Sequence, residues 1–236
     1  MVFDHDIAIQ TAKYLLQINA IKLNTKNCFQ WASGWKSPIY CDNRLALSFP
    51  EIRSYLTKSI ADQVISIYGN QNIIAGVATG AIGIGALVAN KLDSPFIYVR
   101  PEPKKHGRKN QIEGLIAKNK NVIVIEDLIS TGMSSLNAIN ILKENGMNVK
   151  GMISIFTYGF NFVIKKFQSE KIKVNSLSNY EFLINQALKD GYISSNQLEL
   201  LSSWKKKPFK MGSNSVNHFN CRIGKHKNFF FFILKN

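Results

Sequence analysis

Hydrophobic and polar positions follow two different periods along the chain, and together they predict alternating strands and helices. Short apolar runs bounded by turn residues indicate buried strands at residues 72–78, 95–100, 121–128 and 149–157. Between them, segments 80–92 and 134–145 have the composition and spacing of helices. Because parallel strands need crossover connections, the alternation predicts an α/β fold with a central parallel sheet flanked by helices.

The flanking segments predict further helices and a stretch of short extended runs. Helices are expected at 6–19, from about 50 to 68, at 179–189 and at 195–204. Ser48 with Glu51, and Ser194 with Gln197, have the spacing of a capping box. Extended runs at 28–33 and 39–42 flank a turn, and 101–113 is expected to be a loop.

The composition fits a folded protein that stays in the cytoplasm. The chain has 236 residues, of which 45% are hydrophobic and 19% charged, so it can bury a sizeable core. No run approaches the roughly 18–20 apolar residues of a membrane helix. The first ten residues have acids and no basic stretch, so no signal peptide is expected. Three scattered cysteines indicate a reducing compartment and no disulfide framework.

The net charge of +15 raises the possibility of nucleic-acid binding, but its distribution argues against it. Eight of the 30 basic residues and none of the 15 acidic residues follow Glu199, so the rest of the chain carries only +7. Part of that remainder is a basic cluster at 100–109. Such a cluster is typical of a local anion site, or of an ordinary solvated loop, rather than of a duplex-binding face.

Candidate chemistry is concentrated where the strand at 121–128 ends. Glu126 and Asp127 are followed by the hydroxyl-rich loop Ser130-Thr131-Gly132 and then by a helix. Ligands of α/β proteins bind at the carboxyl ends of parallel strands, and the N-terminus of a helix attracts phosphate. The two carboxylates suit vicinal hydroxyls or a Mg²⁺-bridged ribose, so the segment predicts a ribose 5-phosphate site. The simpler alternative is that the carboxylates only cap the following helix.

Residues 122–135 resemble the 5-phosphoribosyl diphosphate (PRPP) signature of type I phosphoribosyltransferases. Two further segments, 31–44 and 100–114, are similar to substrate segments of the orotate phosphoribosyltransferases in particular. The resemblance implies the type I fold over residues 1–208, with a small hood subdomain from about 1–45 and 161–208. It also implies transfer of ribose 5-phosphate from PRPP to orotate, giving orotidine 5′-phosphate and diphosphate in pyrimidine nucleotide synthesis, with Mg²⁺.

The resemblance assigns roles to residues at matching positions. Arg100, Lys104 and His106 would contact PRPP from a basic loop, and Lys104 would stabilise the leaving diphosphate. Thr79 and Gly80 match the tight turn that meets the diphosphate. The ribose-phosphate loop would comprise Glu126, Asp127, Leu128, Ile129, Ser130, Thr131, Gly132, Met133 and Ser134. The catalytic residues would be Lys104, His106 and Asp127.

The base-binding side is less completely matched. Ser130, Tyr40, Cys41 and Lys36 match positions toward the orotate. No residue is expected to be a dedicated Mg²⁺ ligand: PRPP would hold the ion, with Glu126 and Asp127 as the candidates for any contact with the protein. Some members of the family have a lysine where Gly80 stands, and an arginine for the orotate carboxylate near 155–158, where this chain has no cation.

The expected assembly is a homodimer in which the basic loop reaches the partner's site, with neither nucleic acid nor membrane as a partner. Residues 209–236 continue beyond the resemblance as a basic, Phe-rich tail that we expect to be poorly ordered. Two alternatives remain open: a phosphoribosyltransferase for another base, and a non-catalytic PRPP-sensing regulator on the same fold.

Overall fold

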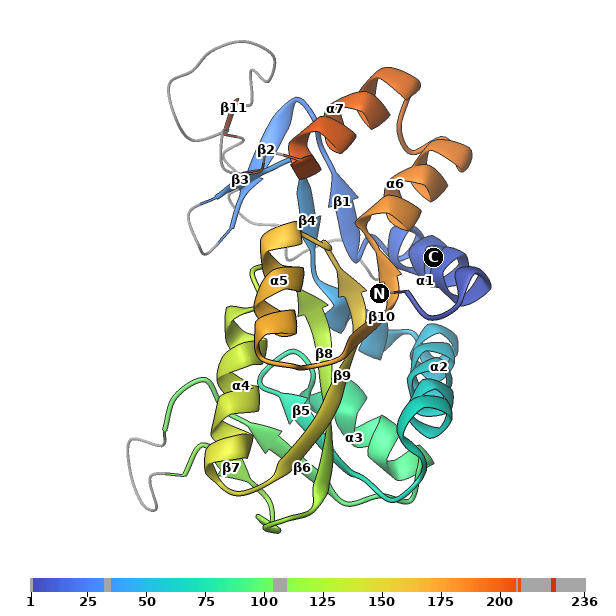
Figure 1. The fold of residues 1–236 in the computed structure, drawn as a ribbon. Helices are drawn as coiled ribbons and strands as arrows, with labels where there is room; N and C mark the ends of the chain where they lie inside the picture. The colour runs from blue at the N-terminus through green and yellow to red at the C-terminus, as the bar shows by residue number, and fades with distance from the viewer. Residues whose placement is uncertain (1, 32–34, 104–109, 207, 209–221, 224–236) are drawn as a thin grey trace.

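A six-stranded sheet forms the centre of the molecule (Figure 1). In this computed structural model, residues 2–31, 35–103, 110–206, 208 and 222–223 are described. The strand order is β10-β9-β8-β5-β6-β7. The strands are β5 (Ile73–Val77), β6 (Phe96–Val99), β7 (Ile112–Glu113), β8 (Asn121–Ile129), β9 (Asn148–Thr157) and β10 (Val174–Asn179). All neighbours pair in parallel except β6 with β7, so the predicted parallel α/β sheet is confirmed.

Helices cover both faces of this sheet (Figure 1). On one face lie α2 (Pro50–Tyr68) and α3 (Ile82–Lys91), and on the other lie α4 (Met133–Glu144) and α5 (Asn161–Ser169). Strand β8 is buried between these layers because its residues 122–125 are all apolar, and each is 0% exposed. A continuous apolar run suits a strand that is covered on both faces.

Most of the remaining elements lie toward the carboxyl ends of the strands (Figure 1). The full set is α1 (His5–Gln17), β1 (Ile21–Leu23), β2 (Asn27–Gln30), β3 (Lys36–Ser37), β4 (Ile39–Cys41), the 3₁₀ helix η1 (Asn43–Ser48), α6 (Tyr180–Lys189), α7 (Ser195–Lys206) and β11 (Arg222–Ile223). Of these, α1 packs beside β10 and η1 packs against α2. β1 pairs with β4, and β2 pairs with β3 and β11. The hood that we propose would take α6 and α7 from the C-terminal part, because β10 belongs to the central sheet.

The structure corrects several local predictions. Helix α2 has Phe49 as its N-cap and no side-chain cap, so Ser48 and Glu51 form no capping box. Ser194 and Gln197 do form one, since the backbone N–H of Ser194 donates to Oε1 of Gln197 at 2.9 Å. The elements β7, α5 and β10 were not predicted. β7 is only two residues long and β10 is largely polar, whereas Val163 and Phe167 of α5 have helical spacing that the sequence interpretation missed. Cys28 is disulfide-bonded, which contradicts the expectation for this cysteine.

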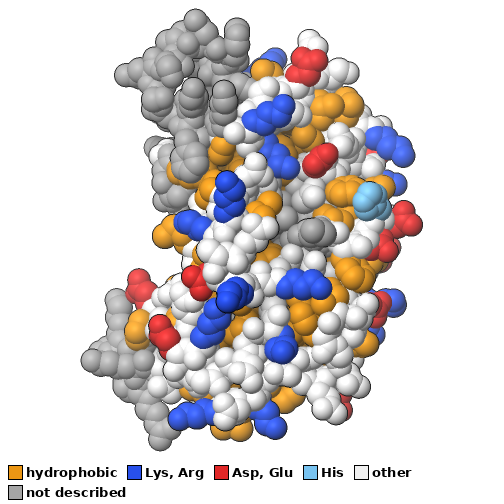
Figure 2. Space-filling view, in the orientation of Figure 1, with side chains coloured by type: hydrophobic (Ala, Val, Ile, Leu, Met, Phe, Trp, Pro, Cys, Tyr) orange, Lys and Arg blue, Asp and Glu red, His pale blue; other side chains and the backbone are white. Residues whose placement is uncertain are grey.

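Two surface features bear on the predicted partners. None of the described helices is long and apolar enough to cross a membrane. On the face shown in Figure 2, Lys and Arg side chains are scattered among uncharged and acidic ones. Most of the tail, 209–221 and 224–236, lies outside the described residues, as do Lys104 and His106.

Candidate active site

The predicted PRPP residues of the described chain gather at one edge of the central sheet. Thr79 and Gly80 follow β5, Arg100 follows β6, and Asp127 lies in the last part of β8. These strands are parallel, so their carboxyl ends share an edge. The closest approach is between Gly80 and Asp127, because a Cβ atom at Gly80 would overlap the Asp127 carboxylate. A side chain at position 80 would therefore require the Asp127 carboxylate to move.

Glu126 is the more deeply buried of the two carboxylates, with 4% of its surface exposed. Its Oε2 accepts a hydrogen bond from the Ser135 hydroxyl at 2.8 Å, and its Oε1 accepts one from the backbone N–H of Asp127 at 3.1 Å. Burial raises the pKa of Glu126 well above its ordinary value, and the neighbouring Asp127 raises it further. Ionisation of this carboxyl is therefore unfavourable in the free protein, and a nearby cation would favour it.

Asp127 is partly exposed and faces the turn after β5. Burial raises its pKa, while the hydrogen bond with Glu126, backbone N–H groups and the positive charge of Arg44 lower it. Its backbone carbonyl accepts a hydrogen bond from Nδ2 of Asn43 at 2.7 Å. A partly accessible carboxylate beside a deeply buried one is suited to bind hydroxyl groups from the open side.

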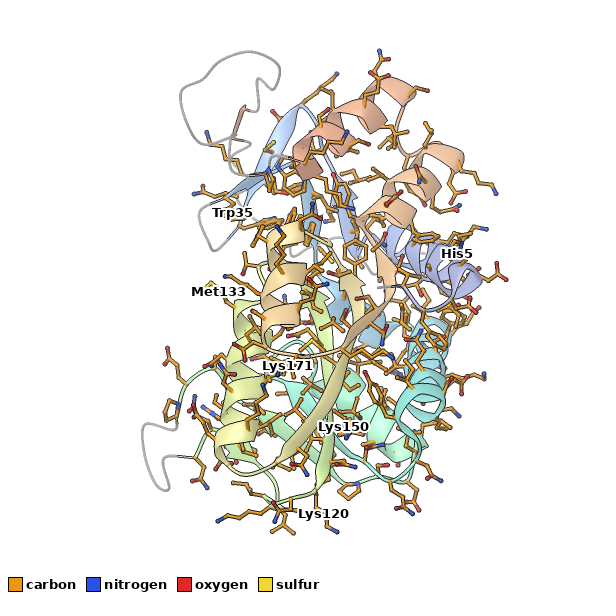
Figure 3. The ribbon with its side chains drawn as sticks, in the orientation of Figure 1. His5, Trp35, Lys120, Met133, Lys150 and Lys171 are labelled. Atoms are coloured by element: carbon orange, nitrogen blue, oxygen red, sulfur yellow. The ribbon has the colours of Figure 1, made fainter. Side chains whose placement is uncertain are left out.

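The loop between β8 and α4 ends in a helix N-terminus without a side-chain cap. Gly132 has φ +72°, and a Cβ there would approach Cγ1 of Val163 to 2.9 Å, so glycine is needed for both conformation and packing. Ser130 and Thr131 are partly exposed, Ser134 is exposed, and Met133, labelled in Figure 3, is 68% exposed. Uncapped N–H groups with hydroxyls around them suit a phosphate monoester.

The predicted base segment lies beside the same edge. The thiol of Cys41 donates to Oδ1 of Asn43 at 3.1 Å, and Asn43 in turn bonds to Asp127. Burial raises the pKa of Cys41 well above its ordinary value, and Asp127 and Asp42 raise it further, so the thiol stays protonated at neutral pH. Tyr40 is 40% exposed and therefore accessible to a ligand.

Other predicted residues are not joined to this centre by any contact within the described part of the chain. Lys36 is partly exposed on β3. Arg100 faces Glu113, with Nη1 of the arginine 3.8 Å from Oε1 of the glutamate. The remaining predicted cations, Lys104 and His106, fall outside the described residues.

Two features of the site were missed by sequence reasoning. One is Asn43, whose side chain bridges Cys41 and Asp127. It lies within segment 31–44, but no role was predicted for it. The other is an aromatic cluster between the hood and the end of β9, formed by Trp31, Trp35, Tyr158, Phe160, Phe162, Tyr180 and Trp204. Trp35 is labelled in Figure 3. The clustering of aromatic letters at 156–162 was the available signal. A cavity of about 820 Å³ adjoins this cluster between α5, α6 and α7, and no predicted site residue lines it.

The fold and this site define a phosphoribosyltransferase, because the family model of the phosphoribosyl transferase domain matches residues 47–174. The orotate phosphoribosyltransferase of Phocaeicola vulgatus is 50% identical over 197 residues, which cover 84% of this chain and 93% of that protein. The crystal structure of orotate phosphoribosyltransferase from Aeropyrum pernix matches with a TM-score of 0.64 and 25% identity, over 77% of this chain and 99% of that one.

Leishmania donovani UMP synthase matches with a TM-score of 0.70 and 25% identity, over 83% of this chain but only 42% of that one. The present chain therefore corresponds to less than half of that longer protein. The chain belongs to the orotate phosphoribosyltransferase family.

Proposed function

We propose that this chain transfers the ribose 5-phosphate group of PRPP to orotate in pyrimidine nucleotide synthesis. The bond between C1 of the ribose and the diphosphate oxygen breaks, a bond forms to N1 of orotate, and the N1 proton is lost. The observation that carries the proposal is the convergence of Gly80, the Glu126–Asp127 pair and the uncapped N-terminus of α4. The chain that carries this site is 50% identical, over 197 residues, to the orotate phosphoribosyltransferase of Phocaeicola vulgatus.

Each part of this site suits one part of PRPP. The N-terminus of α4 and the hydroxyls around it would bind the 5-phosphate. Asp127 would accept hydrogen bonds from the ribose hydroxyls. The backbone amides of Thr79 and Gly80 donate to no other backbone carbonyl in the described chain, so they are free to bind the diphosphate.

Departure of the diphosphate is the difficult event, since negative charge grows on the leaving group while the ribose becomes cationic. Groups placed where charge develops stabilise such a transition state. From the sequence we propose Lys104 for the leaving diphosphate, with His106 and Arg100 contacting PRPP. Asp127 would stabilise the positive charge that develops on the ribose.

The residues present fit Mg²⁺ held mainly by PRPP. Among the described residues no three acidic, His or Cys side chains form a metal cluster. Mg²⁺ commonly binds one or two carboxylates together with substrate phosphates, and Glu126 with Asp127 supplies such a pair. The cation would lower the free-energy cost of ionising the buried Glu126 carboxyl. When bound, Mg²⁺ would neutralise charge on the diphosphate.

On the base side we propose that Tyr40 and Cys41 cover the orotate ring and that Ser130 and Lys36 approach its edge. At the end of β9, Phe156 packs against Tyr158 of the aromatic cluster. Residues 155–158 include no cation, so the orotate carboxylate would find its partners elsewhere. We also propose a homodimer in the cytoplasm, with the basic loop of one subunit reaching the other subunit's site.

One assay tests the function. Purified protein is incubated with Mg²⁺, PRPP and, separately, orotate, uracil, adenine, guanine or hypoxanthine, and diphosphate release is followed. We expect release with orotate and little with the others. Equal use of a purine base would refute the orotate assignment, and no release with any base would refute transferase activity.

A further inference from the structure

Asn43 is a buried polar side chain to which the proposed chemistry assigns no role. Only 2% of it is exposed, and a buried amide needs partners for both its ends. Its Nδ2 donates to the backbone carbonyl of Asp127 at 2.7 Å, and its Oδ1 accepts from Sγ of Cys41 at 3.1 Å. One side chain thus joins the segment that would cover the orotate to the strand that would bind the ribose.

The carbonyl that accepts this bond is one that the sheet leaves unpaired. Strand β8 pairs with β5 only as far as Ile125, and it continues beside β9 to Ile129. Asp127 is not among the paired residues on either side. Its N–H group donates to the Glu126 carboxylate at 3.1 Å. Side chains therefore bond to the N–H and C=O groups of Asp127 itself, while Glu126 and Leu128 on either side of it pair with β9.

The Asp127 carboxylate lies next to Gly80, since a Cβ added there would overlap it. A small rotation of the Asp127 backbone would move the carboxylate relative to the turn that would bind the diphosphate. The bond from Asn43 opposes that rotation. It also ties the position of Cys41 to the position of Asp127, although 84 residues separate Asn43 from Asp127 in the chain.

We infer that Asn43 is a positioning residue, which holds Asp127 in register with the base segment so that ribose and orotate meet in the reactive arrangement. The inference rests on the proposed function. Misplacement of reacting groups by about 1 Å lowers rates by about a hundredfold in well-studied enzymes. Loss of the bridge should therefore affect turnover and the KM values of both substrates, not only folding.

The test uses the full-length protein with Asn43→Ala, Asn43→Asp and the control Asn72→Ala. Asn72 is also buried, 5% exposed, and its Nδ2 donates to the backbone carbonyl of Gly69 at 2.9 Å. It precedes β5, at the end of the strand opposite to Gly80. Both alanine variants lose a buried amide that bonds to the backbone, but only one lies at the site. Asn43→Asp keeps the shape and removes the donor.

We expect Asn43→Ala to lower kcat by about tenfold or more and to raise both KM values. Asn72→Ala should lower the melting temperature without changing the kinetic constants of the folded protein. The inference is overturned if the constants of Asn43→Ala lie within about twofold of those of Asn72→Ala. If Asn43→Ala does not fold, Asn43→Asp decides: folded protein with parental kcat overturns the inference, and a similar loss supports it. An inactive parent would instead refute the proposed function.

Discussion

The ribose side and the base side of the site are held together by different means. On the ribose side, Glu126 and Asp127 lie within a nine-residue strand that pairs with β9 along most of its length and with β5 over residues 122–125. On the base side, Tyr40 and Cys41 belong to a three-residue strand, β4, that pairs only with the three-residue β1. Short two-stranded pairings are marginally stable alone.

Side-chain contacts therefore stabilise the base side. Nε1 of Trp31 donates to the carbonyl of Ile39 at 3.1 Å, and Trp31 itself packs in the aromatic cluster against Tyr158 and Trp204. On the ribose side the central sheet holds most of β8, and the bond from Asn43 to the Asp127 carbonyl adds to it. We infer that damage to the cluster should impair orotate use, whereas damage at the end of β8 should impair PRPP use and chemistry.

The largest expected effect comes from Trp204→Ala. Trp204 is 2% exposed and contacts Trp31, Phe160 and Tyr180 in the cluster. Removing a buried tryptophan side chain costs about 3–5 kcal/mol, so the melting temperature should fall by about 10 °C. At a temperature where the variant is folded, the KM for orotate should rise more than the KM for PRPP. Trp204→Phe, which keeps a ring, should lie between parent and Trp204→Ala. Equal increases in both KM values would show that the two sides are not separable.

Asp127→Asn should have the next largest effect, and it should fall on turnover. The backbone bonds from Asn43 and to Glu126 do not involve the replaced carboxylate, so the variant should fold normally. Loss of one charge that stabilises a transition state typically lowers kcat by about 10²–10³. The control is Asp62→Asn, which breaks an exposed ion pair with Lys58 on α2. If Asp127→Asn kept parental kcat and changed only the KM for orotate, the division into two sides would be wrong.

Gly80→Ala should raise the KM for PRPP by about tenfold with a smaller change for orotate, since its Cβ would displace the Asp127 carboxylate. The matched control is Gly83→Ala, whose Cβ would meet only the end of the Leu47 side chain, at 2.8 Å. That side chain can move, so steady-state kinetics of the control should resemble the parent. If Gly80→Ala had the kinetic constants of the parent, the turn after β5 and Asp127 would not bind PRPP together.

This difference between the sides also explains how much the sequence could predict. The ribose side follows from local pattern: the apolar run at 122–125 predicts a buried strand, and the following carboxylates and Ser-Thr-Gly loop predict the ligand edge. Parallel strands and their helices follow from the same periodicity.

The base side depends on contacts between residues far apart in the chain, which no local pattern encodes. The bond from Asn43 to Asp127 and the packing of Trp31 on Tyr158 and Trp204 are examples. Strand β10 was missed for a related reason: its sequence, Val-Asn-Ser-Leu-Ser-Asn, is polar, yet Ser176 is buried and its hydroxyl lies 2.7 Å from that of Ser154 on β9. Tertiary pairing overrides the weak strand propensity of these residues.

The electrostatic strain at Glu126 allows a finer test of the ribose side. Because burial raises the pKa of Glu126 in the folded state above its ordinary value, the folded state binds a proton more tightly than the unfolded chain does. The protonated Glu126 carboxyl therefore stabilises the folded state. This contribution is fully present below the pKa of the unfolded chain, near 4.5, and is lost as the pH rises through the raised pKa of the folded state. At higher pH the free protein must ionise Glu126 in a buried position.

Glu126→Gln removes this titration and should give the smallest effect, a gain in stability that depends on pH. The glutamine amide oxygen can still accept from the Asp127 N–H, and the Ser135 hydroxyl can turn to accept from the amide nitrogen. Without PRPP or Mg²⁺, the melting temperatures of variant and parent should be close at pH 4.5, and the variant should melt about 2–4 °C higher at pH 8. Adding PRPP with Mg²⁺ should then raise the parent's melting temperature more than the variant's, because the ionised carboxylate gains its partner. A difference that does not change between pH 4.5 and 8 would mean that the pKa of Glu126 is the same in the folded and unfolded states, and that burial of this carboxyl does not set the stability of the ribose side.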